Sequence, residues 1–204
     1  ERVQWVYAAT NNQELEERYD QWVAAYDKDL EDDFAWNAPH NAVQLFAEFV
    51  PSTAKVLDAG AGTGLVGEIL AGLGFRDIVA MDLSMGMLDE AKSKNVYHSF
   101  HQMTLGDNLD YETDAFDAVI SGGVFTLGHA PSSSFDELIG ITKSGGHIVF
   151  SLRTDVYQDG EFKEKQDALD SASAWKLAKV TELFQPLPKG EPEVYHQIWS
   201  YQVI

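Results

Sequence analysis

The fold is decided by the stretch VLDAGAGTG, residues 56–64, in which a short apolar run enters three glycines at positions 60, 62 and 64. Glycine adopts positive φ without strain and lets a ligand approach the backbone closely. Two classes of cofactor are bound by such a loop after the first strand of an α/β domain. The residues around the loop separate the two classes.

The first class is the dinucleotides, whose binding loop has the pattern G-x-G-x-x-G. Gly62, Gly64 and Gly67 fit this pattern literally. However, the turn has already begun at Ala59 and Gly60, so this register lies too far beyond the end of the strand. Asp58 also places a carboxylate just before the turn, where it is poorly placed beside a pyrophosphate. The dinucleotide interpretation is therefore the weaker one.

The second class is a ligand without phosphate, around which Gly60, Gly62 and Gly64 shape an open loop. Asp58 can face a cationic ammonium, directly or through water, and Asp82 can accept hydrogen bonds from both hydroxyls of a ribose. S-adenosylmethionine carries this ammonium and ribose and no phosphate, so it is the predicted cofactor. Two alternatives stay open: a domain that has lost its ligand, and Asp82 as an ordinary carboxylate at the entry of a helix near Ser84.

Outward from this loop, apolar runs with the period of strands alternate with segments of helical period. We expect helices at 1–30, 39–49, 65–73, 84–91, 135–141 and 162–172, and strands at 55–58, 78–81, 96–103, 116–120, 147–152, 175–184 and 194–203. This order predicts a Rossmann-like, doubly wound α/β fold with seven strands, mostly parallel, and an antiparallel C-terminal edge hairpin. Residues 1–204 are expected to form one domain, with lid or substrate helices in 1–50 and the core in 54–204.

The glycine stretch, with Met81-Asp82-Leu83-Ser84 and Met87-Leu88, resembles the class I S-adenosylmethionine-dependent methyltransferases over roughly residues 19–155. More narrowly, the chain resembles the methyltransferase-like proteins related to the Williams–Beuren region. The residues that carry this second resemblance are Tyr19-Asp20-Gln21-Trp22, Tyr26-Asp27, Ala38-Pro39 and the run SGGVFTLGHAP at 121–131. The resemblance implies methyl transfer, with S-adenosylhomocysteine as the product of the cofactor.

The resemblance also implies which residues contact the cofactor. The methionine part would be lined by Gly60, Ala61 and Gly62, the ribose held by Asp82, the adenine packed by Leu83 and Met87, and the methyl group and methionine tail faced by Ser121 and Gly122. The family often places an acidic residue after the third strand, to meet the adenine amine. Here Thr104 and Leu105 stand at that point, with Asp107 three residues on. Either Thr104 substitutes, or the loop shifts and Asp107 serves.

Methyl transfer from a sulfonium is an in-line displacement, in which the protein mainly aligns the reacting atoms and excludes water. A base is needed only if the nucleophile arrives protonated. His129, in a loop after the fourth strand, is the candidate base because histidine titrates near neutral pH. The alternative is a structural or helix-entry histidine.

An aromatic stripe on the first helix suits a lid over the cofactor, because aromatic faces attract cations. The stripe consists of Tyr19, Trp22 and Tyr26. The alternative is that these side chains only pack the helix against the core. The substrate is expected to meet two further groups: Trp36, Asn37 and His40 after this helix, and Arg153 and Tyr157 after the fifth strand. Arg153 could pair with a substrate carboxylate, or form an ordinary surface ion pair.

Composition narrows the class of acceptor. Fourteen basic and 33 acidic residues give a net charge of −19, which repels phosphate backbones and argues against a nucleic-acid partner. The chain has no cysteine, no trusted spacing of metal ligands and no stretch long enough to span a membrane, so we expect no metal, no membrane and a cytoplasmic location. The predicted function is methylation of N, O or S in a small molecule. The alternatives are a protein or RNA methyltransferase and a non-catalytic cofactor-binding protein, and the oligomeric state is open.

Overall fold

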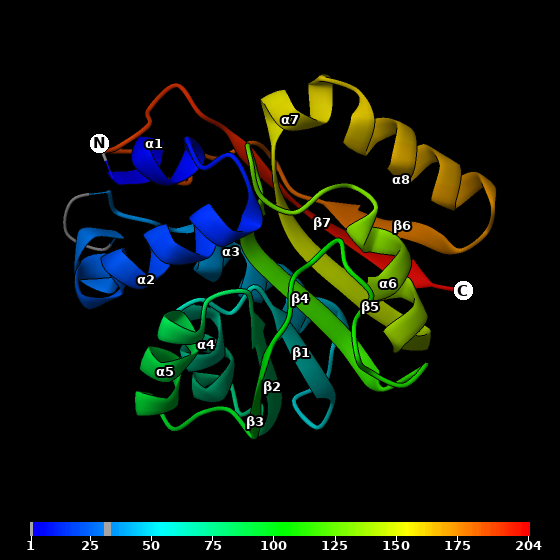
Figure 1. Cartoon of the computed structure of the whole chain (residues 1–204). Helices are drawn as coiled ribbons and strands as arrows, with labels where there is room; N and C mark the ends of the chain where they lie inside the picture. Colours follow the sequence, from blue (N-terminus) through cyan, green and yellow to red (C-terminus); the bar gives the residue numbers. More distant parts are fainter. Residues whose placement is uncertain (1, 31–33) are drawn as a thin grey trace.

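A computed structural model describes residues 2–30 and 34–204 and shows one seven-stranded sheet, in the order β3-β2-β1-β4-β5-β7-β6 (Figure 1). The strands are β1 (Lys55–Ala59), β2 (Asp77–Asp82), β3 (Ser99–Gln102), β4 (Phe116–Phe125), β5 (Thr142–Arg153), β6 (Trp175–Val180) and β7 (His196–Val203). The pairs among β1 to β5 are all parallel, and β7 pairs antiparallel with β5 and β6. The predicted fold class is confirmed.

Helices cover both faces of the sheet and one of its ends (Figure 1). They are α1 (Arg2–Tyr7), α2 (Asn12–Lys28), α3 (Ala38–Phe49), α4 (Leu65–Gly72), α5 (Met85–Ser93), α6 (Ser134–Ile141), α7 (Thr154–Gln158) and α8 (Glu161–Ser171). Alternation along β1 explains the two layers, because successive side chains point to opposite faces. Val56 packs into a core with Phe46 of α3, whereas Leu57 packs into a larger core with Phe135 of α6.

The C-terminal hairpin lies at the edge of the sheet, as expected, and β6 is its outermost strand. β7 lies between β5 and β6 and pairs with β5 from His196 to Gln202. Its side chains Ile198 and Tyr201 are buried, whereas most residues of β6 are exposed, including Lys176 and Lys179. A strand with exposed lysines suits an edge, since charge there discourages further pairing.

Several element boundaries differ from the sequence expectation, and two of these differences have a local cause. The single helix expected over residues 1–30 is interrupted, because the Asn11 side chain caps α2 at the amide of Glu14, and the Glu14 carboxylate accepts a hydrogen bond from the amide of Thr10. β5 begins at Thr142 rather than after the glycines, because Thr142 pairs with Phe116 before the strand bends at Gly145, where φ is 82°. Irregular pairing near Phe116 accommodates this bend.

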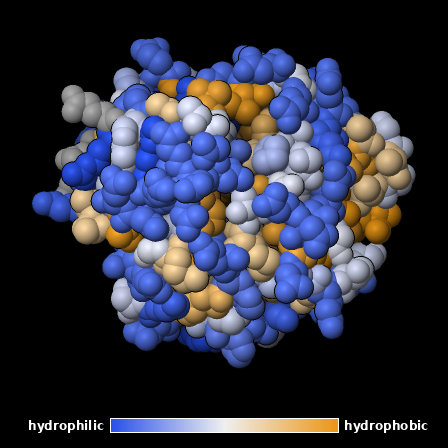
Figure 2. All heavy atoms as spheres, viewed as in Figure 1, coloured by the Kyte–Doolittle hydropathy of each residue, from blue (hydrophilic) through white to orange (hydrophobic). Residues whose placement is uncertain are grey.

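The surface is mostly hydrophilic on the face shown in Figure 2, with hydrophobic side chains gathered in separate patches. This appearance agrees with the excess of acidic residues. Across residues 2–30 and 34–204, no helix is both long and apolar enough to cross a membrane.

Candidate active site

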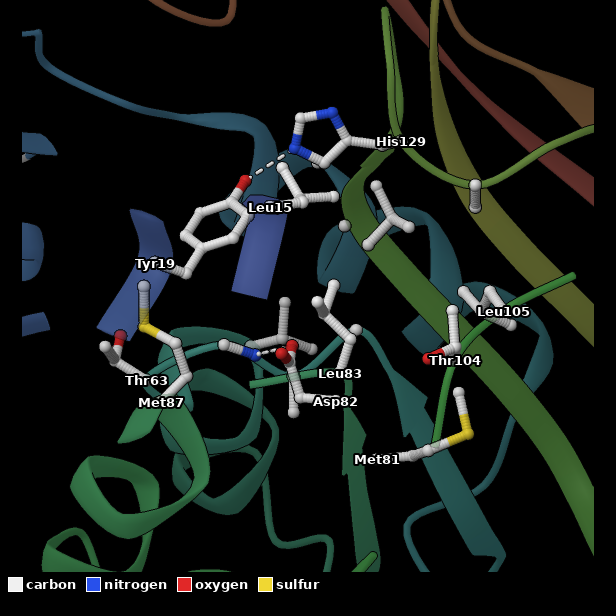
Figure 3. A pocket seen from close by; sticks show the side chains of 18 of the residues that line it. Leu15, Tyr19, Thr63, Met81, Asp82, Leu83, Met87, Thr104, Leu105 and His129 are labelled. Carbon is white, nitrogen blue, oxygen red and sulfur yellow. Dashed lines mark hydrogen bonds between the residues drawn. The ribbon is translucent and has the colours of Figure 1, made fainter. Parts of the chain in front are cut away.

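A pocket of about 830 Å³, here called the central pocket, lies where β1, β2 and β4 reach their carboxyl ends (Figure 3). Helix α2 supplies one wall. The lining residues are Asn12, Leu15, Tyr19, Tyr26, Trp36, Gly60, Ala61, Gly62, Thr63, Leu65, Val66, Met81, Asp82, Leu83, Met87, Met103, Thr104, Leu105, Gly122, Gly123, Val124, His129 and Ala130.

The glycine loop forms the floor of the central pocket and is tied to the end of β2. The amides of Gly60 and Ala61 both donate to the carbonyl oxygen of Met81, at 2.7 and 2.9 Å. Gly62 has a φ of +55°, and a Cβ there would meet no atom within 4 Å. The loop therefore offers bare backbone to a ligand, as the sequence predicted for this stretch.

Asp82 ends β2 and lies beside this loop on the pocket wall, with 8% of its surface exposed. Its Oδ2 accepts a hydrogen bond from the amide of Gly62 at 2.8 Å, and its Oδ1 accepts one from the amide of Ser84 at 2.9 Å. Burial raises the pKa of Asp82 to about 6, despite these hydrogen bonds. A carboxylate has about four acceptor positions. Two backbone amides therefore leave Asp82 room for further donors, such as two hydroxyls.

The apolar side chains of Leu83, Met87 and Leu105 also line the pocket: Leu105 lies beside Thr104, between β3 and β4, whereas Met87 lies on the side of Tyr19 and Thr63 (Figure 3). Asp107 is exposed and lies outside the lining set. Of the two alternatives raised by the sequence at this point, the structure places only Thr104 at the pocket.

Asp58 lies behind the glycine loop rather than in the pocket. It is fully buried and accepts a hydrogen bond from the Tyr97 hydroxyl at 2.6 Å, and burial raises its pKa to about 7. The Tyr97 hydroxyl also accepts a hydrogen bond from the amide of Gly67, and a Cβ on Gly67 would lie 2.3 Å from the tyrosine ring. The third glycine of the apparent dinucleotide pattern therefore makes room for Tyr97. Ser121 is also buried, and it donates to the carbonyl oxygen of Ala59 at 2.7 Å.

Tyr19 and His129 meet on the opposite side of the pocket from Asp82 (Figure 3). The Tyr19 hydroxyl lies 2.7 Å from Nε2 of His129, and Nδ1 of His129 lies 2.8 Å from the carbonyl oxygen of Leu127. A carbonyl only accepts, so the proton of the neutral imidazole is on Nδ1, and Nε2 accepts from Tyr19. Burial lowers the pKa of His129 and raises that of Tyr19. Both groups are therefore neutral at neutral pH.

Two aspartates that lie about two turns apart on α2 hold this helix against the core. Asp20 accepts hydrogen bonds from the Ser84 hydroxyl at 2.5 Å and the Gly86 amide at 3.1 Å. Asp27 accepts a hydrogen bond from the Thr63 hydroxyl and pairs with Lys94 at 2.8 Å. Helix α2 is thereby attached to both the glycine loop and α5, and it positions Tyr19 and Tyr26 on the pocket.

The remaining predicted site residues are dispersed. Trp36 lines the central pocket, whereas Trp22 is buried beneath α2 and donates to Asp29 at 2.7 Å. Four side chains that were expected to meet the substrate lie outside the pocket: those of Asn37, His40, Arg153 and Tyr157. Asn37 donates to the carbonyl of Gln185, and His40 is exposed. The Nε of Arg153 binds both oxygens of Asp155, and Tyr157 packs on Trp199.

Some lining residues were not predicted. Leu15 lies one turn before Tyr19 on the same helical stripe, so its spacing was an available signal. Met103 and Val124 depend on where β3 and β4 end, which the sequence did not define. Tyr97 and Asp27 were missed as supports, because their partners are distant in the chain.

The lining residues fit S-adenosylmethionine better than a dinucleotide. Among the described residues of the wall there is no lysine or arginine to meet a pyrophosphate, whereas Asp82 offers a carboxylate to a ribose. Apolar side chains and Thr104 surround the space beyond it, which suits an adenine. Within the same described residues, no group of three or more His, Asp or Glu side chains is arranged to hold a metal ion.

Comparison with known proteins agrees with this geometry. Residues 57–150 match the family described as "Methyltransferase domain". The human protein Methyltransferase-like protein 27 is 32% identical over 166 residues, which cover 78% of this chain and 66% of that protein. A demethylmenaquinone methyltransferase of Renibacterium salmoninarum is 38% identical over 98 residues, which cover 47% of this chain and 39% of that protein. This chain thus spans about two thirds of the human relative and less than half of the bacterial one.

Among solved structures, the cyclase SpnF superposes with a TM-score of 0.73 at 15% sequence identity, covering 96% of this chain and 97% of that one. At this identity the likeness concerns the fold alone.

Proposed function

Because the chain belongs to the class I S-adenosylmethionine-dependent methyltransferases, we propose that it methylates N, O or S of a small-molecule acceptor. The cofactor of this family is S-adenosylmethionine, and its product is S-adenosylhomocysteine. The bacterial relative is named for demethylmenaquinone, which is a small molecule.

One observation carries the proposal of a small acceptor: α2 lies over the glycine loop and is fixed there by Asp20 and Asp27. A protein or RNA substrate needs an open groove, whereas this helix encloses the central pocket on one side. The net charge of −19 also disfavours RNA. Residues 1–50 thus act as lid and substrate helices on the core of residues 54–204.

We assign the cofactor contacts as follows. Asp82 holds the ribose hydroxyls, Thr104 meets the adenine edge, and Gly60, Ala61 and Gly62 lie along the methionine part. Leu83, Met87 and Leu105 pack against the adenine. Asp58 and Ser121 lie behind the residues that contact the cofactor. Asp58 accepts the hydrogen bond of Tyr97, and Ser121 donates to the carbonyl at the end of β1.

When bound, the cofactor supplies a methyl group on a positively charged sulfur that departs as a neutral thioether. The protein then needs only to align an acceptor and to remove its proton where it has one. Tyr19 and His129 are arranged for this second task. The Tyr19 hydroxyl takes the acceptor's proton as it passes its own proton to Nε2 of His129. Tyr19 stays neutral throughout, which agrees with its raised pKa.

The experiment that tests the proposal begins with calorimetric titration of the protein with S-adenosylmethionine, with NAD as the control. Binding of the first alone is expected. Formation of S-adenosylhomocysteine is then measured with a panel of small amines, phenols and thiols, and with total protein and RNA as comparison substrates. Turnover only with RNA or protein would contradict a small acceptor, and NAD binding would contradict the cofactor assignment.

A protein that binds the cofactor without transferring methyl is the second candidate, and it predicts binding with no product from any acceptor. The Tyr19–His129 pair disfavours it, because a mere binding protein has no use for a base on the acceptor side of the pocket. The cytoplasmic location stays a prediction.

A further inference from the structure

Trp36 stands between the central pocket and a second cavity of about 500 Å³, and it lines both. The second cavity lies between α1, α2 and the segment that leads into β7. Two other residues, Tyr26 and Gly123, also line both cavities. These three residues, here called the partition, therefore separate the two spaces.

The indole of Trp36 lies directly on the backbone of β4 at Gly123. Gly123 has a φ of +80°, and a Cβ there would lie 2.6 Å from Cζ2 of Trp36. The amide of Gly123 donates to the Ser151 hydroxyl at 2.7 Å, which fixes this part of the strand. Tyr26 contacts the indole edge-on, with ring centroids 6.5 Å apart. The partition is therefore closely packed, and the packing requires a glycine at position 123.

The backbone around Trp36 is held from both sides. The amide of Trp36 donates to the carbonyl of Leu30 at 2.8 Å, and the amide of Asn37 donates to the carbonyl of Pro186 at 3.1 Å. Ala35, directly before Trp36, has a φ of +54°, which is uncommon for a residue other than glycine. Such a conformation persists only where the surrounding structure imposes it. The fold therefore fixes the position of the indole.

Trp36 belongs to the wall that carries the candidate base. Edge-on ring contacts run from His129 to Tyr19 at 5.8 Å, from Tyr19 to Tyr26 at 6.1 Å, and from Tyr26 to the indole. Burial lowers the pKa of His129 and raises the pKa of both tyrosines, so these side chains are neutral at neutral pH. An uncharged ring that packs edge-on or offset against them suits this wall.

Beyond the partition, the second cavity offers apolar space. Val6, Leu30 and Leu187 line it, pack in one cluster and are each at most 6% exposed. The polar side of this cavity is occupied by the protein itself, because the Tyr7 hydroxyl lies there among polar side chains that include Thr126. A ligand that entered the second cavity would therefore place an apolar group in it.

We propose that Trp36 determines the specificity for the methyl acceptor by limiting its length. A compact, uncharged aromatic acceptor fits between the Tyr19–His129 pair and the indole, whereas a longer one is stopped at the partition. This inference rests on the proposed function, because it treats the molecule that meets Tyr19 and His129 as the acceptor. Replacing the indole by a methyl group joins the two cavities, so that an apolar extension passes Gly123 and reaches Val6.

The test compares two probes that differ by one phenyl ring, phenol and 4-phenylphenol. Each is titrated by NMR into the natural protein and into Trp36→Ala, both saturated with S-adenosylhomocysteine. We expect Trp36→Ala to bind 4-phenylphenol at least about tenfold more tightly than the natural protein does, because the second ring becomes buried. The affinity for phenol should not rise, since phenol does not extend beyond the indole. Equal affinities of the two proteins for 4-phenylphenol would overturn the proposal.

Two further variants sharpen the comparison. Trp36→Phe keeps an aromatic side chain and should give a smaller gain for 4-phenylphenol, and it decides the test if circular dichroism shows that Trp36→Ala is unfolded. Leu187→Ala is the matched control, because it enlarges the second cavity and leaves the partition in place. A gain in Leu187→Ala as large as that in the Trp36 variants would overturn the assignment to Trp36, as would no gain in either Trp36 variant.

A second measurement locates the added ring. Intermolecular NOEs from this ring to the methyl groups of Val6 and Leu30, which line only the second cavity, are expected in Trp36→Ala and not in the natural protein. The NOEs need neither cofactor nor turnover, so they separate the two proposals. Their absence in Trp36→Ala, or their presence in the natural protein, would overturn the role of Trp36 alone. Failure of the titration with S-adenosylmethionine would count against methyl transfer alone.

Discussion

The Tyr19 hydroxyl and Nε2 of His129 lie 2.7 Å apart, although 110 residues separate them in the chain. The contact joins α2 to the loop after β4, and the carbonyl of Leu127 fixes the imidazole from its other nitrogen. Neither residue could be paired with the other from the sequence, where His129 was a candidate base and Tyr19 part of an aromatic stripe. Together they make a pair that is neutral at rest, and a proton taken from an acceptor would leave its positive charge on His129 and not on Tyr19.

Tyr19→Phe removes the donor to His129 and should slow methyl transfer at least about tenfold with an acceptor that arrives protonated. The KM for S-adenosylmethionine should change little. A hydrogen bond to Nε2 favours the neutral imidazole, so its loss should raise the pKa of His129, which histidine NMR resonances report without any acceptor. Tyr111→Phe is the matched control, since its buried hydroxyl has no partner among the described residues. If the pKa of His129 does not change in Tyr19→Phe, the two residues do not act as a pair.

Asp82→Ala should abolish most cofactor binding while the fold persists. The carboxylate offers acceptors to the ribose and also holds the amides of Gly62 and Ser84, so its loss both removes contacts and loosens the loop. Two charged hydrogen bonds at about 1.5–3 kcal/mol each predict a loss of at least about 100-fold in affinity. Calorimetry measures this, and circular dichroism checks the fold. Asp77→Ala, at the opposite end of β2, should bind normally. Normal cofactor binding by Asp82→Ala would show that Asp82 does not hold the ribose.

Cofactor affinity should also depend on pH through Asp82, whose pKa is raised to about 6 by burial. The ionised carboxylate accepts from the ribose hydroxyls, and its protonated form has less acceptor capacity. Affinity should therefore be constant above about pH 7 and fall by up to tenfold per pH unit below about 6. Titrations with S-adenosylhomocysteine from pH 5 to 8 measure the profile. A flat profile would show that the ribose does not rely on this charge.

Much of the fold and one wall of the site could be predicted from the sequence, because those features are local. The glycine loop, Asp82 and the turn into α5 follow one another within about 30 residues, and their spacing in the chain determines their spacing in space. The same locality applies to Leu83 and Met87. Alternating strands and helices fixed the parallel sheet for a similar reason.

The rest depends on contacts between distant segments. Asp58 was expected to face the ligand, but Tyr97 lies behind the loop and takes its hydrogen bond instead. Arg153 was expected at a substrate or in a surface ion pair, and the structure gives it both a neighbouring Asp155 and a buried face toward Glu191. Neither partner has a sequence signal, because side chains on different elements meet only after the sheet has formed.

Asp27→Asn should loosen the helix that covers the pocket. Asp27 pairs with Lys94, which is only 10% exposed, and also accepts from Thr63. Loss of a partly buried pair worth about 1 kcal/mol predicts release of S-adenosylhomocysteine about fivefold faster, with faster amide exchange over α2. Stopped-flow dissociation and hydrogen exchange measure the two effects. Asp89→Asn breaks an exposed pair with Lys92 on α5 and serves as control. Equal release rates in both variants would mean that α2 does not retain the ligand.

Asp58→Asn should make stability less dependent on pH, and the sign follows from proton binding. Burial raises the pKa of Asp58 from an ordinary 3.8 to about 7, so the folded state holds a proton that the unfolded state releases between these values. The stability of the natural protein is therefore reduced by Asp58 as the pH rises from about 4 to about 7, by at most about 4 kcal/mol. The asparagine oxygen still accepts from Tyr97, and no charge develops.

Urea unfolding of both proteins from pH 4 to 8 should therefore show Asp58→Asn gaining relative stability as the pH rises through this window. Asp117→Asn provides a control of opposite sign. Its pKa is lowered, first by the Lys143 side chain and then by the amide of Lys55, so the natural carboxylate stabilises the fold above its ordinary pKa. Because this effect develops below the ordinary pKa of 3.8, the Asp117→Asn variant should lose relative stability as the pH rises toward 4 and should then differ from the natural protein by a constant amount from pH 4 to 8. A stability difference for Asp58→Asn that stays constant from pH 4 to 8 would show that Asp58 ionises with an ordinary pKa behind the glycine loop.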